Sequence, residues 1–187
     1  MPNSLTYEEG ATMSAVYCTA IHCLLDVGGL RKGRSVLVHS ASGGVGIAVL
    51  YIAHMVGAEI YATVGSEEKV QFLMSTFNIP RHRIFNSRTS EFLPRVMEET
   101  NGVGVDVVLN SLSGELLHAS WKCTAEFGTF VEIGRRDFVG QGLLGMQLFE
   151  PNRSFVGFDL LLFSNKRPEK IERYVTAGAA PLKAVKD

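Results

Sequence analysis

The stretch VLVHSASGGVGIAVL, residues 36–50, places three glycines between two apolar runs. Gly43, Gly44 and Gly46 predict a tight turn between a buried strand and a helix, where a dinucleotide's pyrophosphate can bind. In that fingerprint the second glycine lets the backbone approach the pyrophosphate, and the third lets the helix pack on the strand. Ala41 replaces the first glycine and is compatible with the turn if its φ angle stays negative. The alternative is a strand-to-helix turn without a ligand.

Cofactor choice in such folds is made at the end of the second strand, where an acidic residue binds the ribose hydroxyl of NAD. This sequence has Gly65 and Ser66 there, and Lys69 follows one helical turn later. A hydroxyl and a cation suit a 2′-phosphate, so the pattern favours NADP(H) over NAD(H). Glu67 and Glu68 are expected to point to solvent from the first helical turn. The alternative for Lys69 is a solvated surface lysine.

Polar residues follow three later strands, at the carboxyl edge where ligands bind in open α/β sheets. Asn110 and Ser111 follow the fourth strand, with a capped turn as the alternative. Arg135 follows the fifth strand within EIGRRDF, with a solvated loop as the alternative. Asp159 follows the sixth strand and is the weaker candidate, because an aspartate there can also cap a helix.

The elements that must position these residues alternate between strands and helices. Strands are expected at 35–39, 58–64, 83–86, 105–110, 128–133 and 154–160. Helices are expected at 12–27, 45–56, 66–76, 90–100 and 114–124, the fourth of them starting late or bending at Pro94. This order predicts β-α-β units and an α/β fold: a Rossmann-type, doubly wound, mainly parallel six-stranded sheet with helices on both faces.

Composition limits the class of protein. The 187 residues are 46% hydrophobic and 20% charged with a net charge of −1, so nucleic acid and anionic membranes are not expected partners. The N-terminal residues lack a secretory signal, and no apolar run is long enough to span a membrane. Cys18, Cys23 and Cys123 fit reduced thiols in a cytoplasmic protein. Neither the cysteines nor the five histidines have the spacing of metal ligands, so no metal site is expected.

Several blocks together resemble one family. They are VLVHSASGGVGIAVLYIA, ATVGSEEK, FNSR, VDVVLNSLSGELLHASWKC and FVEIGRRDF. Over residues 2–160 the chain resembles the enoyl reductase domain of fungal highly reducing polyketide synthases, in the zinc-independent branch of the medium-chain dehydrogenase/reductase superfamily. The blocks are also similar to the enoyl reductase of animal fatty acid synthase and, more loosely, to quinone oxidoreductases.

The resemblance implies a domain organisation. In the family a GroES-like barrel precedes the nucleotide-binding domain, and substrate binds between the two. Residues 1–34 resemble the linker helix from that barrel, and the barrel itself is not in the sequence. Residues 35–160 form the NADP-binding Rossmann domain, and residues 161–187 a C-terminal helix and a tail that departs from the family pattern. We therefore expect one domain of a longer protein.

The resemblance also implies the reaction, which is reduction of a trans-2-enoyl thioester on an acyl carrier protein. NADPH gives a hydride to the β-carbon and a proton adds at the α-carbon, without a metal. Arg135 resembles in position a lysine proposed as proton donor in the fatty acid synthase relatives. Arginine keeps its proton, so stabilising enolate charge or binding the cofactor suits it better than acid catalysis. The residues expected to bind NADPH are Ala41, Ser42, Gly43, Gly44, Val45, Gly46, Gly65, Ser66, Lys69, Asn86, Ser87, Asn110, Ser111, Gly134 and Arg135.

The resemblance also implies which partners the protein has. The implied partners are the carrier-bound enoyl thioester and neighbouring megasynthase domains, with a homodimer left open. Without the barrel, this chain alone is expected to be inactive. Two alternatives stay open at this point: a stand-alone quinone or enone reductase, and a truncated fragment that only binds nucleotide or docks within a megasynthase.

Overall fold

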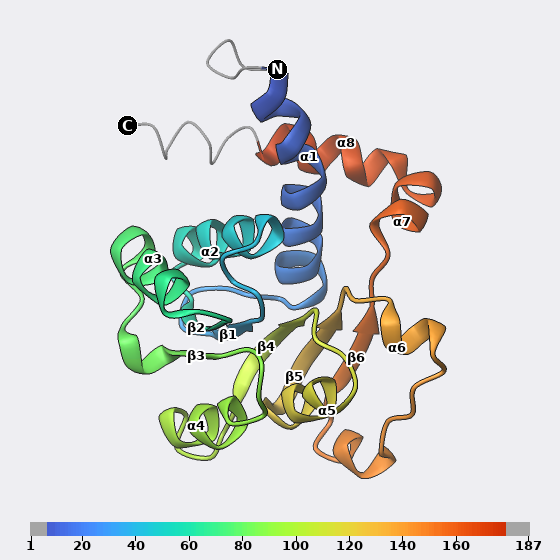
Figure 1. The fold of residues 1–187 in the computed structure, drawn as a ribbon. Coiled ribbons are helices and arrows are strands. Elements are labelled where there is room, and N and C mark those ends of the chain that lie inside the picture. The colour runs from blue at the N-terminus through green and yellow to red at the C-terminus, as the bar shows by residue number, and fades with distance from the viewer. Residues whose placement is uncertain (1–6, 179–187) are drawn as a thin grey trace.

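The fold is built on a parallel sheet of six strands (Figure 1). The computed structural model describes the backbone of residues 7–178 and the side chains of residues 13–175. The strands are β1 (Ser35–Val38), β2 (Glu59–Val64), β3 (Ile84–Asn86), β4 (Val105–Asn110), β5 (Thr124–Glu132) and β6 (Ser154–Gly157). Their order is β3-β2-β1-β4-β5-β6 and every neighbouring pair is parallel. The doubly wound α/β fold predicted from the sequence is therefore confirmed.

Helices cover both faces of the sheet (Figure 1). They are α1 (Tyr7–Ile21), α2 (Gly44–Val56), α3 (Glu67–Phe77), α4 (Phe92–Glu99), α5 (Glu115–Lys122), α6 (Arg136–Val139), α7 (Leu160–Lys166) and α8 (Pro168–Gly178). One hydrophobic core joins α1, α2 and α3 to one face, and a second core around Trp121 joins α4 and α5 to the other. Because both faces are buried, the interior of β1 and β4 is mostly apolar, with Val36, Leu37 and Val38 in β1 and Val107, Val108 and Leu109 in β4.

Two of the helices end at a single residue in the left-handed backbone conformation. Gly57 ends α2 in the left-handed conformation, with φ 72°, and its N–H bonds to the carbonyl oxygens of Ala53 and His54. Asn78 ends α3 in the same way, with φ 51°. These ends turn the chain back toward β2 and β3 and so close two successive β-α-β units.

The structure corrects several of the expected bounds. The first helix begins at Tyr7, and its continuation from His22 to Val27 is a π-helix. β5 begins four residues earlier than expected, because its register against β4 shifts between Val105 and Val107. The sixth strand ends at Gly157, since Asp159 starts α7, which the sequence pattern did not predict.

The expected end segments pack on the Rossmann core. The part of residues 1–34 that the structure describes includes α1, which contacts α2, and α8 from residues 161–187 contacts α1. Tyr174 on α8 is buried, and its hydroxyl donates to Asp26 and contacts His22 Nδ1 at 2.9 Å. Residues 1–6 of the expected linker and residues 179–187 of the expected tail lie outside the described residues.

Candidate nucleotide-binding site

The glycine turn lies between β1 and α2. The backbone N–H of Ala41 donates to Thr63 O at 3.0 Å, which joins the turn to β2. The positive φ angle in this turn, 52°, belongs to Ser40 and not to Ala41. Alanine therefore occupies position 41 without strain, as the sequence argument required. A Cβ at position 46 would lie 2.5 Å from Ala41 O, so Gly46 is needed for the helix to pack against the turn.

The first turn of α2 is open at its N-terminus. Its N-cap residue is Gly43, which has no side chain to cap the helix, and the first bond into the helix runs from Ile47 N to Gly43 O. The N–H groups of Gly44, Val45 and Gly46 precede that bond, and the helix dipole adds positive potential there. Gly43 and Gly44 are exposed, and Ser42 and Val45 are half-buried. This arrangement fits a phosphate group.

A small cavity lies at the carboxyl ends of β2 and β3. Its volume is about 140 Å³, and Gly65, Ser66 and Asn86 are among its lining residues. Ser66 is the N-cap of α3 but makes no side-chain capping bond, so its hydroxyl is not used by the helix. Lys69, on the first turns of α3, is exposed, and Ser87 is half-buried beside Gly65.

Arg88 belongs to the same corner, and sequence reasoning missed it. Its Nε donates to Gly65 O at 3.2 Å. A Cβ at position 65 would lie 3.0 Å from that nitrogen, so the glycine makes room for the guanidinium. The signal was present in the block FNSR, whose arginine directly follows two of the expected cofactor residues.

The turn after β4 meets the glycine turn at the centre of the sheet. Ser111 Oγ lies 3.4 Å from Ser40 Oγ, so the loops after β1 and β4 are neighbours where the strand order reverses. Asn110 is fully buried, and its side chain bonds to the backbone of Leu112 and to Glu132. The alternative of a capped turn therefore describes this side chain, while Ser111 is exposed at the edge.

Arg135 lies beyond the end of β5 and pairs with Asp159. Their side chains are 3.3 Å apart, and the guanidinium is 70% exposed. Asp159 also caps α7, because its Oδ1 accepts from Leu162 N at 3.0 Å. Between α6 and α7 the pair borders a hollow of about 390 Å³. Its other lining residues are Gly134, Phe138, Val139, Gly157, Phe158 and Leu162.

A second residue that sequence reasoning missed is Glu132, the last residue of β5. It is only 2% exposed, and its carboxyl group accepts hydrogen bonds from Asn110 Nδ2 and Gly134 N. Burial raises its pKa to about 7, and nearby Asp137 contributes in the same direction, against the lowering effect of the two bonds. The available signal was a charged residue within the apolar run FVEI.

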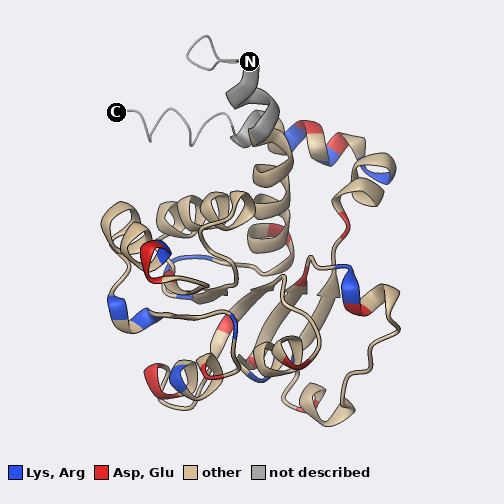
Figure 2. Ribbon diagram, viewed as in Figure 1, with Lys and Arg blue, Asp and Glu red and all other residues tan. Residues whose placement is uncertain are grey.

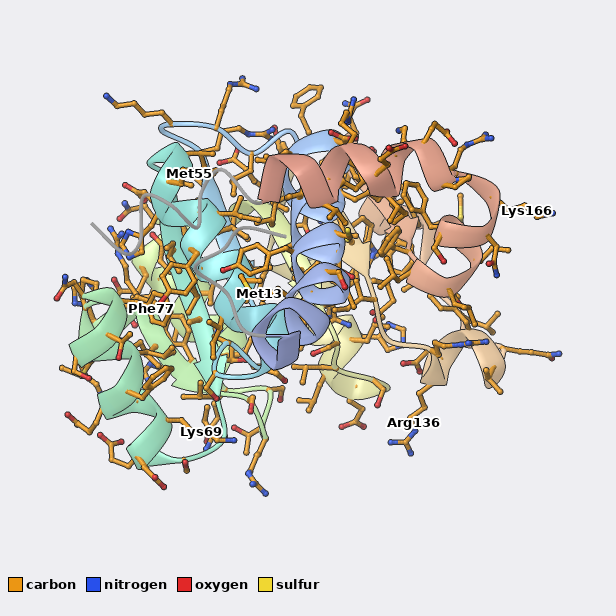
Figure 3. The ribbon with its side chains drawn as sticks, turned by 90° about the horizontal axis from the view of Figure 1, so that it is seen from above. Met13, Met55, Lys69, Phe77, Arg136 and Lys166 are labelled. Carbon is orange, nitrogen blue, oxygen red and sulfur yellow. The ribbon has the colours of Figure 1, made fainter. Side chains whose placement is uncertain are left out.

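The expected site residues thus form three groups along one edge of the sheet. The glycine turn lies at the centre. On one side is the Ser66 corner, which consists of Gly65, Ser66, Asn86 and Arg88, and on the other is the Arg135 hollow, the space bordered by Arg135 and Asp159. Figure 3 shows Lys69 on α3 far from Arg136 on α6, the residue that directly follows Arg135. This separation suits an extended ligand that spans the edge, such as a dinucleotide.

Charged residues and possible metal ligands are spread over the described residues without forming a cluster of either kind that suggests a further site. Figure 2 shows acidic and basic residues interspersed over the fold. Among the residues that the structure describes, no helix has the length and apolarity of a membrane span. The same residues contain no group of three or more histidine, cysteine, aspartate or glutamate side chains that could hold a metal ion.

Comparison with known proteins now places the chain in a family. Residues 44–176 match the family model described as zinc-binding dehydrogenase. The chain belongs to this family. Within it, the chain is similar to the highly reducing polyketide synthase pspA of Penicillium soppii, at 89% identity over 94% of the chain. The chain spans about 7% of the length of that relative.

Solved structures narrow the relationship within the zinc-binding dehydrogenases. The CurK enoyl reductase is 36% identical with a TM-score of 0.87, and the match covers 100% of this chain and 55% of that one. The nucleotide-binding subdomain of the PpsC enoyl reductase from Mycobacterium tuberculosis is 36% identical with a TM-score of 0.85, over 93% of this chain and 96% of that one. The chain is therefore the nucleotide-binding half of a polyketide synthase enoyl reductase domain, as the resemblance implied.

Proposed function

We propose that this chain binds NADPH for the reduction of an enoyl thioester carried by an acyl carrier protein. The observation that carries the proposal is the open first turn of α2, held against the glycine turn by the close contact of Gly46 with Ala41. It lies where the strand order of the sheet reverses, which is where ligands bind in open α/β folds. The relatives named above support the reductase assignment.

The choice of NADPH over NADH is argued from the Ser66 corner. No acidic residue occupies the end of β2, where one would bind the ribose hydroxyl of NAD. Ser66 and Arg88 instead offer a hydroxyl and a cationic group at Gly65, and Lys69 follows Ser66 by one helical turn. Glu67, which also lines the cavity, is paired with Arg81 at 3.5 Å. A 2′-phosphate carries negative charge and accepts such hydrogen bonds, whereas a 2′-hydroxyl gains little from them.

The remaining contacts follow the edge of the sheet. Residues 41–46 would hold the pyrophosphate, Asn86 and Ser87 would border the adenosine, and Ser111 and Gly134 would face the nicotinamide end. A bound nicotinamide supplies the hydride, and the protein supplies its orientation. Arg135 would provide positive charge for the developing thioester oxyanion, because its guanidinium holds its proton and donates hydrogen bonds.

The partners of the whole enzyme are part of the same proposal. The similar curated proteins are highly reducing polyketide synthases, so the enoyl thioester would be delivered on a carrier domain of the same assembly. The substrate would bind between this domain and a GroES-like barrel. We therefore expect this chain alone to bind NADPH without turning over substrate. Sedimentation of the whole enzyme tests whether it forms a homodimer.

Titration of the chain with NADPH and NADH, followed by nicotinamide fluorescence, tests the cofactor assignment. We expect NADPH to bind at least about tenfold more tightly, as one charge-assisted hydrogen bond can provide. Lys69→Gln and Arg88→Gln should weaken NADPH and leave NADH unchanged. Lys122→Gln, at an exposed lysine on α5, is the matched control. Equal affinity for the two cofactors would contradict the NADPH assignment, and no binding of either would contradict the function.

A further inference from the structure

Glu132 connects the end of β4 to the loop after β5. One carboxyl oxygen accepts from Asn110 Nδ2 and the other from the backbone N–H of Gly134, at 2.5 Å. A Cβ at position 134 would lie 2.6 Å from the second oxygen, so a larger residue there would displace the carboxyl group. The same two segments are also joined by a backbone bond from Ile133 N to Asn110 O. The carboxyl group thus bonds one donor at the end of β4 and one in the loop after β5, and the Asn110 side chain in turn bonds Leu112 in the loop after β4.

Residues of α5 and α6 surround Glu132. It lines a cavity of about 160 Å³ together with His118 of α5 and Asp137 of α6. The Asp137 carboxylate accepts from Gly114 N at 3.1 Å, which links α6 to the loop after β4 a second time. Arg136 adds a weaker contact of 3.4 Å from its guanidinium to Ser113. Two acidic side chains therefore hold the segment after β5 against the loop after β4.

The position of Arg135 depends on these contacts. Arg135 directly follows Gly134, and its backbone continues into α6. At the surface the guanidinium has one partner close by, Asp159 at 3.3 Å, and is largely exposed. A side chain so exposed is held mainly by where its backbone lies, and the backbone on its N-terminal side is bonded to Glu132.

We propose that Glu132 is a positioning residue of the reductase, whose carboxyl group fixes the loop after β5 to the loop after β4 and so sets where Arg135 meets the nicotinamide end. The inference rests on the proposed function, because the nicotinamide end exists only if NADPH binds along this edge. Glu132 itself is only 2% exposed, so the proposed effect passes through its bond to Gly134 and not through direct contact with the cofactor. Its effect should therefore be confined to one half of the bound cofactor.

Binding of two ligands to variants of the full chain tests this. Adenosine 2′,5′-bisphosphate fills only the half of the site at the Ser66 corner, and NADPH fills both halves. Glu132→Leu removes both acceptors, and Glu132→Gln keeps one. We expect Glu132→Leu to weaken NADPH roughly tenfold and to reduce its fluorescence enhancement, with a smaller loss for Glu132→Gln. The affinity for the bisphosphate should stay within about twofold. Glu126→Gln, at an exposed glutamate of β5, is the matched control.

The outcomes separate the two proposals. Unchanged NADPH affinity and fluorescence in both variants would overturn the role of Glu132 and leave the proposed function intact. Equal weakening of both ligands, with a lower melting temperature, would show a general structural role and would also overturn it. Because Glu132→Gln keeps the polarity of the site, it decides the question if Glu132→Leu does not fold. Wild-type protein that binds neither ligand would contradict the proposed function itself.

Discussion

Replacing Glu132 by glutamine should change how the free energy of unfolding depends on pH. The pKa of Glu132 is raised from its ordinary value of 4.5 to about 7, chiefly by burial. Between these values the unfolded chain has already released the proton that the folded protein still holds. The stability contributed by the neutral carboxyl group is therefore fully present below about pH 4.5 and is lost as the pH rises to about 7. Glutamine does not titrate, so the variant lacks this loss.

The size of the effect follows from the shift. One pKa unit corresponds to about 1.4 kcal/mol, so the rise from 4.5 to about 7 makes the ionised group cost the folded state about 3 kcal/mol. About 2.5 kcal/mol of this cost develops between pH 5 and pH 8. The difference in unfolding free energy between Glu132→Gln and wild type should move by that amount in favour of the variant. The amide also leaves one N–H donor without an acceptor, a penalty that is the same at every pH.

Urea unfolding followed by tryptophan fluorescence measures this difference. Trp121 is the single tryptophan of the sequence and is fully buried in the second core, so its emission reports global unfolding. Glu126→Gln serves as control and should show no pH-dependent difference from wild type. A difference that stays constant from pH 5 to pH 8 would refute the raised pKa. A difference that moves the other way would mean that the two donors stabilise the carboxylate more than burial destabilises it.

Three further predictions concern other parts of the fold. Gly46→Ala should lower the melting temperature and the affinity for NADPH, because the added Cβ would lie 2.5 Å from a backbone oxygen. In Gly44→Ala the added Cβ would lie 3.4 Å from the nearest side chain, so this variant should keep a melting temperature within about two degrees of wild type. Tyr174→Phe should cost about 1–2 kcal/mol in urea unfolding, because it removes the hydroxyl that bonds Asp26. No loss would show that the hydroxyl adds nothing to the ring packing of Tyr174 and the ion pair of Arg173 with Asp26. Burial lowers the pKa of His39 from 6.5 to about 3, so wild-type stability should fall by about 2 kcal/mol from pH 6.5 to pH 4.5 relative to His39→Gln. Parallel curves would show that the pKa of His39 is the same in the folded and unfolded states and would contradict the lowered value.

The sheet and the central turn could be predicted from the sequence because each depends on local patterns. Apolar strands alternating with helices allow few topologies other than a doubly wound sheet. The spacing of Gly43 and Gly46 predicts the geometry of the turn, and the close contact with Ala41 confirms that Gly46 is needed for packing of the helix on the turn. The absence of an acid after β2 is likewise visible without a structure.

Other features depend on contacts between distant segments, which a single sequence does not show. The π-helix from His22 to Val27 lies where residues of α7 and α8 pack around His22, over 130 positions later in the chain. α7 is short, and its start is marked only by Asp159, which equally fits a strand end. Arg88 became visible as part of the Ser66 corner only because its guanidinium reaches back 23 residues to Gly65.

Asn110 shows where reasoning from position alone reaches its limit. Its place at the carboxyl end of β4 predicts contact with a ligand, because that edge of a parallel sheet is where ligands bind. Successive side chains of a strand point to opposite faces, and the last residue can turn either outward or into the loop. Here the neighbouring strand carries Glu132, whose buried carboxyl group accepts a hydrogen bond from the Asn110 amide. The edge position therefore identifies the loop after β4 as part of the site, while the contact with Glu132 assigns the Asn110 side chain to holding that loop in place.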